Sequence, residues 1–173
     1  MDEFDAIEDN FASYAKLLTE DSVARFAALR GCSFFDPVPD EWLKRISEMA
    51  SIQTYYSDVC LTSQDDDMKA FYVVLQGSAE AFRNGKVVGT IDSGECFGEA
   101  IFFGNGTIAT SATVIADYKI IAAEFSKGVV ENLRADPDAM VSMDKALLLA
   151  LFKKLQRANH KIEKLMLTNS MSN

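Results

Sequence analysis

The pattern of apolar and polar positions divides the chain into helical, β-prone and again helical parts. Residues 3–31 place apolar side chains at three- and four-residue steps, which predicts helix, with a break and an N-cap at Thr19–Ser22. Residues 34–50 predict a proline-punctuated turn and a short amphipathic helix. Short β-prone runs begin near residue 51, and helical spacing returns at Asp136.

The middle part consists of β-prone runs separated by turn residues. In order, the runs read IQTYYS, VCLTS, FYVVLQ, SAEAF, KVVGTI, TSATVIA and KIIAAEF. Arg83–Lys86 has Asn-Gly at its centre, a strong hairpin signal because both turn positions need positive φ. We therefore expect residues 78–83 and 86–91 to pair, and Asp92–Glu95 to form another turn. Seven or so such strands predict a β-barrel or β-roll.

The last part opens with a clear helix signal. Asp136 suits the N-cap, Pro137 the first position and Asp138 the positive end of the helix dipole. A 3-4 alternation of apolar residues, typical of a coiled-coil seam, then runs through Leu148, Leu151, Leu155, Ala158, Ile162 and Leu165. One roll cannot readily cover so long a helix, so we expect a homodimer through it.

Composition and charge narrow the function. The net charge of −9 opposes binding to phosphate backbones, so we expect no DNA or RNA partner. The longest apolar run, Ala146–Phe152, is too short to span a bilayer, and the acidic start lacks the core of a secretion signal. We therefore expect a cytoplasmic protein without a membrane partner.

The sequence offers little for metal or enzyme chemistry. Its three cysteines stand far apart, and His160 is the only histidine. We find neither a nucleophile–base pair nor a set of metal ligands, and Asp65–Asp67 fits a solvated loop. We therefore expect no enzyme, no catalytic residue, no metal and no cofactor.

Three runs, taken in order, carry a family resemblance. FYVVLQGSAEAF, GKVVGTIDSGECFGEAIFF and TSATV resemble the cyclic-nucleotide-binding domain family, and more narrowly the sensor half of Crp-Fnr (catabolite-activator) type regulators. The likeness covers roughly Phe34–Leu165, and its most specific parts are Gly77, Gly94 and Phe97–Glu99. It implies a mainly β fold, a double-stranded β-helix or jelly-roll-like β-roll with N-terminal helices and a long C-terminal helix.

The resemblance also implies a division of the chain. Residues 1–31 would form a helical extension, residues 32–135 the roll, and residues 136–173 the long helix and its tail. Regulators of this family usually carry a DNA-binding helix-turn-helix after the long helix. Because this chain stops at Asn173, we expect a sensor domain without that domain.

In the family, the segment that opens Phe-Gly-Glu and closes on Arg-(Ala/Ser)-Ala-(Thr)-Val is a phosphate-binding cassette. Gly98 leaves room for a close backbone approach, and a short helix after it could offer free N–H groups to an anion. The resemblance implies that Glu99 accepts a hydrogen bond from a ribose hydroxyl. The candidate ligand-binding residues are Gly98, Glu99, Ala100, Thr110 and Ser111.

The chain departs from the family at the phosphate clamp. Thr110 stands where the family has arginine, and shifting the alignment by one residue supplies no cation. Hydrogen bonds to charged groups contribute about 1.5–3 kcal/mol against roughly 1 for neutral ones, so phosphate affinity should fall about ten- to a thousandfold. Arg83 is expected to lie too far away. Lys153 or Lys154 could approach the mouth of the roll, although a solvated helix face is the simpler interpretation.

Two interpretations remain open. The chain is either a sensor module that binds a cyclic nucleotide or a related small ligand, such as cAMP, or a degenerate module that serves ligand-independent dimerisation or docking. Apolar side chains such as Phe102, Phe103 or Ile108 filling the cavity would favour the second.

Overall fold

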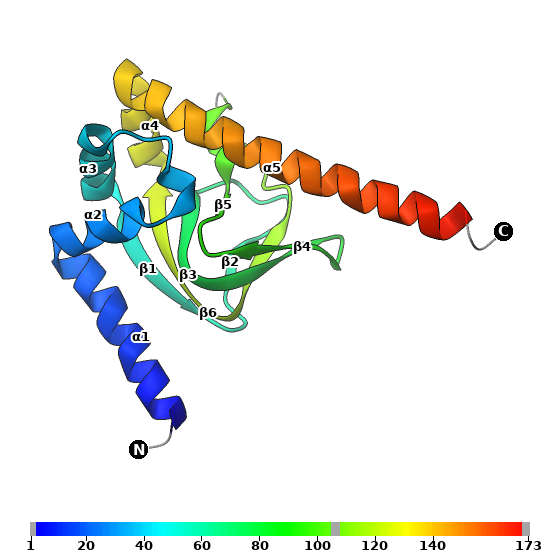
Figure 1. Ribbon diagram of the computed structural model, residues 1–173, viewed down its shortest axis with the longest axis horizontal. Helices are drawn as coiled ribbons and strands as arrows, with labels where there is room; N and C mark the ends of the chain where they lie inside the picture. Colours follow the sequence, from blue (N-terminus) through cyan, green and yellow to red (C-terminus); the bar gives the residue numbers. More distant parts are fainter. Residues whose placement is uncertain (1–2, 105–107, 171–173) are drawn as a thin grey trace.

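A computed structural model describes residues 3–104 and 108–170, and the side chains of residues 10–104 and 108–168 (Figure 1). The helices are α1 (Glu3–Glu20), α2 (Ser22–Arg30), α3 (Asp40–Met49), α4 (Lys127–Ala135) and α5 (Pro137–Ser170), with the 3-10 turns η1 (Ser33–Phe35) and η2 (Glu99–Phe102). The strands are β1 (Ser51–Tyr56), β2 (Cys60–Thr62), β3 (Ala70–Arg83), β4 (Lys86–Asp92), β5 (Cys96–Phe97) and β6 (Thr113–Ser126). Across these residues, no helix combines the length and apolar character needed to cross a membrane.

One antiparallel sheet forms the roll, and the chain has the mainly β fold that the resemblance implied. Its strands follow the order β1-β6-β3-β4, while β2 also pairs with β6 and β5 with β3. The two long strands, β3 and β6, pair from Ala70 opposite Ser126 to Phe82 opposite Thr113. In Figure 1, α2, α3 and α4 gather at one end of the roll, while α5 runs across it and extends beyond it.

The turns and helix caps that the sequence predicts are present in the structure. β3 and β4 form the expected hairpin, with Arg83 opposite Lys86. The carboxylate of Asp21 caps α2 by accepting hydrogen bonds from two backbone amides, and Asp136 accepts one from Ala139 at the start of α5. These features depend on neighbours in the chain, which is why the sequence predicted them.

Two predictions of element boundaries were wrong. FYVVLQ and SAEAF form one strand, β3, and TSATVIA and KIIAAEF form one strand, β6. Gly77 bends β3 without ending it: its φ is +90°, and a Cβ there would lie 2.1 Å from the carbonyl oxygen of Lys119 on β6. The sequence reading also missed α4, which Ser126 caps and which buries Val130 and Leu133.

Alternate residues of β3 belong to two apolar clusters, as expected of a strand buried on both faces. Phe71 and Val73 join a cluster that includes residues of α2, α3, α4 and α5. Tyr72 and Val74 join a second cluster with residues of β4, β5 and β6. The first cluster fixes the helices to the outside of the roll, and the second fills part of its interior.

The two ends of α5 have different surroundings. Near its start, Met143 and Leu147 are fully buried in the larger cluster. Farther along, the side toward the roll is held by cations: Lys154 pairs with Glu99, Arg157 with Glu95, and Lys161 donates to the carbonyl of Val88. The apolar side of this part is exposed, with Leu148, Phe152, Leu155, Ile162, Leu165 and Met166 all more than half exposed.

Candidate ligand-binding site

The roll encloses a cavity of about 220 Å³, which we call the roll cavity. Its walls come from β4, from Phe97–Glu99 and from Thr110–Val114. Four of the five residues expected to bind ligand line it, namely Gly98, Glu99, Thr110 and Ser111. Ala100 does not line it: this residue is partly buried and packs against the larger apolar cluster.

Gly98 is the residue immediately before η2, and its conformation sets the direction in which η2 begins. Its φ is +79°, in the left-handed region that favours glycine. A Cβ at this position would lie 2.6 Å from the backbone carbonyl oxygen of Ala70, which cannot move without disturbing β3. Only glycine therefore lets the chain turn here and place Glu99 at the cavity wall.

Glu99 is already paired in this structure. The Nζ atom of Lys154 lies 2.8 Å from its Oε1 atom, and the two side chains are 37% and 19% exposed, respectively. Lys154 is the single cation that lines the roll cavity within the described part of the chain. The expectation that a lysine of the long helix could reach the mouth of the roll is confirmed for Lys154, and a solvated helix face is the wrong interpretation for it.

Thr110 and Ser111 form the wall where the family places its arginine. Thr110 is 6% exposed, and its backbone is fixed at both ends: its amide donates to Asp66 and its carbonyl accepts from Asp65, each at 2.8 Å. Ser111 is exposed at the cavity rim. Arg83 is exposed in the β3–β4 hairpin and does not line the cavity, so it offers no substitute guanidinium.

The apolar residues that could have filled the cavity lie elsewhere. Phe102 is buried against Phe71, with ring centroids 5.1 Å apart, and Phe103 is 56% exposed. Ile108 packs against the larger cluster. The tip of the loop, Asn105–Thr107, lies outside the described residues.

One aromatic ring, that of Phe97, lies in the cavity wall next to Gly98. Phe97, which lines the cavity, stacks on Tyr72 with centroids 4.6 Å apart and planes 9° from parallel. Burial, followed by the charge of Glu124, raises the pKa of Tyr72 to about 12, so its hydroxyl stays protonated at neutral pH. The cavity wall next to Gly98 is therefore apolar, and the ring stacked behind it is uncharged.

Sequence reasoning named Lys154 only as one of two lysines that could approach the mouth of the roll, and it did not predict the pairing with Glu99. The signal that could have found it is the spacing of Lys154, Arg157 and Lys161, which places three cations on one face of α5. Spacing alone cannot say which acid a cation meets. Glu99 is 55 residues away in the chain, and only the fold brings the two together.

Comparison with known proteins agrees with this architecture. Residues 52–136 match the model of the cyclic nucleotide-binding domain family. No curated protein sequence matches the chain closely enough to count as a relative.

Solved structures share the fold at low sequence identity. A cyclic nucleotide-binding domain from Methylobacillus flagellatus KT is 15% identical, with a TM-score of 0.71, over 82% of this chain and 85% of that one. The sensor domain of the transcriptional regulator DNR from Pseudomonas aeruginosa is 19% identical, with a TM-score of 0.58, over 84% and 95%.

A third structure is the regulatory domain of Toxoplasma gondii PKA in complex with cAMP, 19% identical with a TM-score of 0.63. The match covers 80% of this chain but about half, 51%, of that one. Residues 52–136 of the chain therefore match the cyclic nucleotide-binding domain family, and the solved structures share the fold of the roll.

Proposed function

We propose that the chain is a regulatory sensor domain that binds a cyclic nucleotide or a closely related small ligand weakly in the roll cavity. The observation that carries this proposal is the open cavity itself, with Gly98 and Glu99 in its wall and with Phe102, Phe103 and Ile108 lying elsewhere. The PKA regulatory domain that shares the fold was solved with cAMP. The absence of a guanidinium at Thr110 is the reason for expecting weak binding.

A direct titration tests the proposal. Millimolar cAMP or cGMP should raise the melting temperature by roughly a few degrees, because a ligand that binds only the folded state stabilises it by mass action. A Thr110→Arg variant should bind about tenfold more tightly or better, since it restores a charge-assisted contact with phosphate. Thr110→Gln is the matched control, because it adds length without charge.

A second function, docking without ligand, is favoured by one specific contact. Lys154 already occupies the carboxylate of Glu99 that a ribose hydroxyl would use. If neither the native chain nor Thr110→Arg binds any cyclic nucleotide while both remain folded by circular dichroism, the docking function replaces the sensor function.

We further propose that α5 pairs with the α5 of a second copy. The support is its row of exposed apolar residues at heptad spacing, in particular Leu148, Leu155 and Ile162, which are 63%, 58% and 52% exposed. Sedimentation equilibrium should give the mass of a dimer. A monomer at all concentrations would contradict this part of the proposal and leave ligand binding unaffected.

A further inference from the structure

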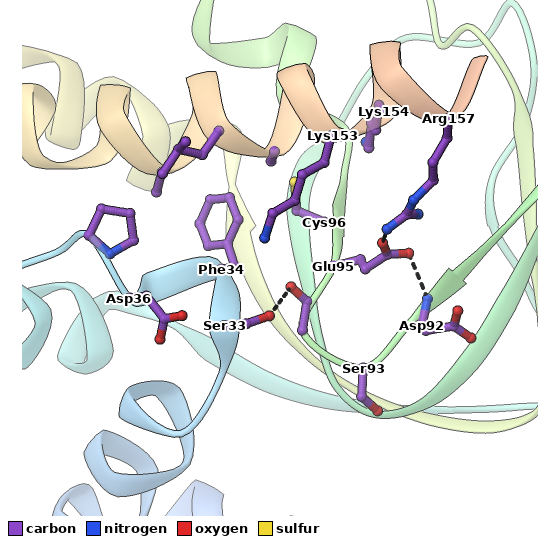
Figure 2. A pocket seen from close by; sticks show the side chains of 15 residues that line it. Ser33, Phe34, Asp36, Asp92, Ser93, Glu95, Cys96, Lys153, Lys154 and Arg157 are labelled. Carbon is purple, nitrogen blue, oxygen red and sulfur yellow. Dashed lines mark hydrogen bonds and ion pairs between the residues drawn. The ribbon is translucent and has the colours of Figure 1, made fainter. Parts of the chain in front are cut away.

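A second and larger cavity lies on the outside of the roll, beneath α5. It measures about 380 Å³ and is bounded by α5, by η1 with the turn that follows it, and by Asp92–Cys96 (Figure 2). We call it the α5 cavity. It shares one lining residue with the roll cavity, Lys154, so the two are separate spaces on either side of that side chain.

One wall of the α5 cavity is apolar. Phe34 is 5% exposed and turns its ring to the cavity from η1. Ala146, Leu149 and Ala150 of α5 complete this wall. A volume in the range of small-molecule sites, with an aromatic ring and methyl groups on one side, suits the apolar body of a ligand the size of a benzene ring or somewhat larger.

α5 also brings to this cavity one cation without an acidic partner among the described residues. Three cations line the cavity, but Lys154 pairs with Glu99 and Arg157 with Glu95. Figure 2 shows Lys153 directed from α5 into the cavity, and among the described residues it has no ion-pair partner. A single negative group entering the cavity would therefore meet a free ammonium next to an apolar surface.

The rim limits the charge that an occupant can carry. Asp36 and Asp92 are exposed carboxylates at the cavity edge. They would repel a doubly charged group more strongly than a singly charged one. Glu95 adds little to this repulsion because its carboxylate is engaged by Arg157 and by the amide of Asp92.

From these contacts we propose that the α5 cavity is a second binding site, for a small monocarboxylate with an aromatic or other apolar body. Lys153 holds the carboxylate, and Phe34 with the α5 side chains holds the apolar body. Because the walls belong to both α5 and the roll, an occupant contacts both at once. The site does not depend on the roll cavity and does not rest on the function proposed for it.

Benzoate is a suitable probe, with phenyl phosphate and benzyl alcohol as arms that separate its chemistry. Titrations are followed by methyl NMR, where Ala146, Leu149 and Ala150 report on the α5 cavity while Ala112 and Val114 report on the roll cavity. Benzoate should shift the first group of signals saturably and leave the second group unchanged. Phenyl phosphate, a dianion at pH 8, should bind more weakly than benzoate because of the rim.

Charge at Lys153 decides the outcome. Lys153→Gln should weaken benzoate binding about tenfold and leave benzyl alcohol unchanged, since it removes one charged contact and no apolar one. Lys164→Gln, an exposed lysine of the same helix outside both cavities, is the matched control. Equal binding of benzyl alcohol and benzoate, tighter binding of phenyl phosphate, or an unaltered Lys153→Gln variant would each overturn the assignment. Failure of cAMP to bind would overturn only the function proposed for the roll cavity.

Discussion

The roll cavity and the α5 cavity lie on opposite sides of Lys154 and differ in how their charge is arranged. The roll cavity has the Phe-Gly-Glu turn typical of the matched family, yet the one cation that lines it among the described residues is held by Glu99. The α5 cavity matches no motif of the sequence, yet Lys153 faces it without an acidic partner among the described residues. A suitable backbone and an available charge are thus separate requirements of a binding site. The roll cavity has the first, and the α5 cavity has the second.

The largest expected effect on stability comes from a substitution that disturbs the Gly98 turn in the wall of the roll cavity. Gly98→Ala should lower the free energy of unfolding by about 2–5 kcal/mol, because the left-handed conformation costs an alanine roughly 1–2 kcal/mol and crowding against packed atoms adds roughly 1–3. The new Cβ would meet the carbonyl of Ala70 at 2.6 Å. Urea denaturation measures the loss.

Gly85→Ala is the matched control for that variant. Gly85 also has a positive φ, +72°, but a Cβ there would meet no atom within 4 Å. It should therefore show the conformational cost alone, about 1–2 kcal/mol. Equal losses in the two variants would mean that β3 can move away from the Gly98 turn, and that the cavity wall is less rigid than its geometry implies.

The contrast between backbone design and available charge also explains what the sequence could predict. The Asn84-Gly85 turn, the Asp21 and Asp136 caps and the Gly98 turn are set by residues close together in the chain, so their patterns carried the prediction. The fold followed, because these local signals come in the order of the family. The α4 helix was missed because it is nine residues long and follows directly on the apolar end of β6.

The charges of the site could not be predicted in the same way. Whether Lys153 or Lys154 reaches a carboxylate depends on how α5 crosses the roll. The burial of Met143 and Leu147 fixes that crossing, and these residues are distant in sequence from Glu99. The α5 cavity combines residues of η1, of the turn before β5 and of α5. No spacing rule connects three segments so distant in sequence.

An intermediate effect, on cAMP binding, is expected when each of the two neighbouring lysines is replaced by glutamine. Lys154→Gln leaves the partly buried Glu99 without its cation, so the roll cavity becomes negative and should bind cAMP about tenfold less tightly. Lys153→Gln, which lines only the α5 cavity, should not change cAMP binding.

Isothermal titration calorimetry can compare these variants, in the native chain and in the Thr110→Arg background where binding is expected to be stronger. Tighter cAMP binding by Lys154→Gln would show instead that Lys154 competes with the ligand for Glu99. Lys153 would then favour binding in the α5 cavity, whereas Lys154 would hinder binding in the roll cavity.

The smallest expected effect on stability comes from the Arg157–Glu95 pair, which borders the α5 cavity. Burial opposes ionisation of Glu95, but hydrogen bonds from Arg157 and from the amide of Asp92 outweigh it and lower the pKa of Glu95 below its ordinary value of 4.5. A lowered folded-state pKa means that the contribution to stability is fully present above pH 4.5 and is lost as the pH falls through the folded value. Glu95→Gln should therefore reduce stability at neutral pH by about 1 kcal/mol or less, since Arg157 is largely exposed.

The difference between native chain and Glu95→Gln should shrink as the pH falls below 4.5, which urea denaturation at several pH values can follow. Glu20→Gln is the control, because the Lys16–Glu20 pair is 3.9 Å apart with both side chains more than 60% exposed, and its loss should be near zero at every pH. A Glu95→Gln difference that stays constant into acid would assign the role of Glu95 to packing. Arg157 would then be unneeded for holding α5 over the cavity, and α5 would be fixed there by its apolar contacts and by the contacts of Lys154 and Lys161.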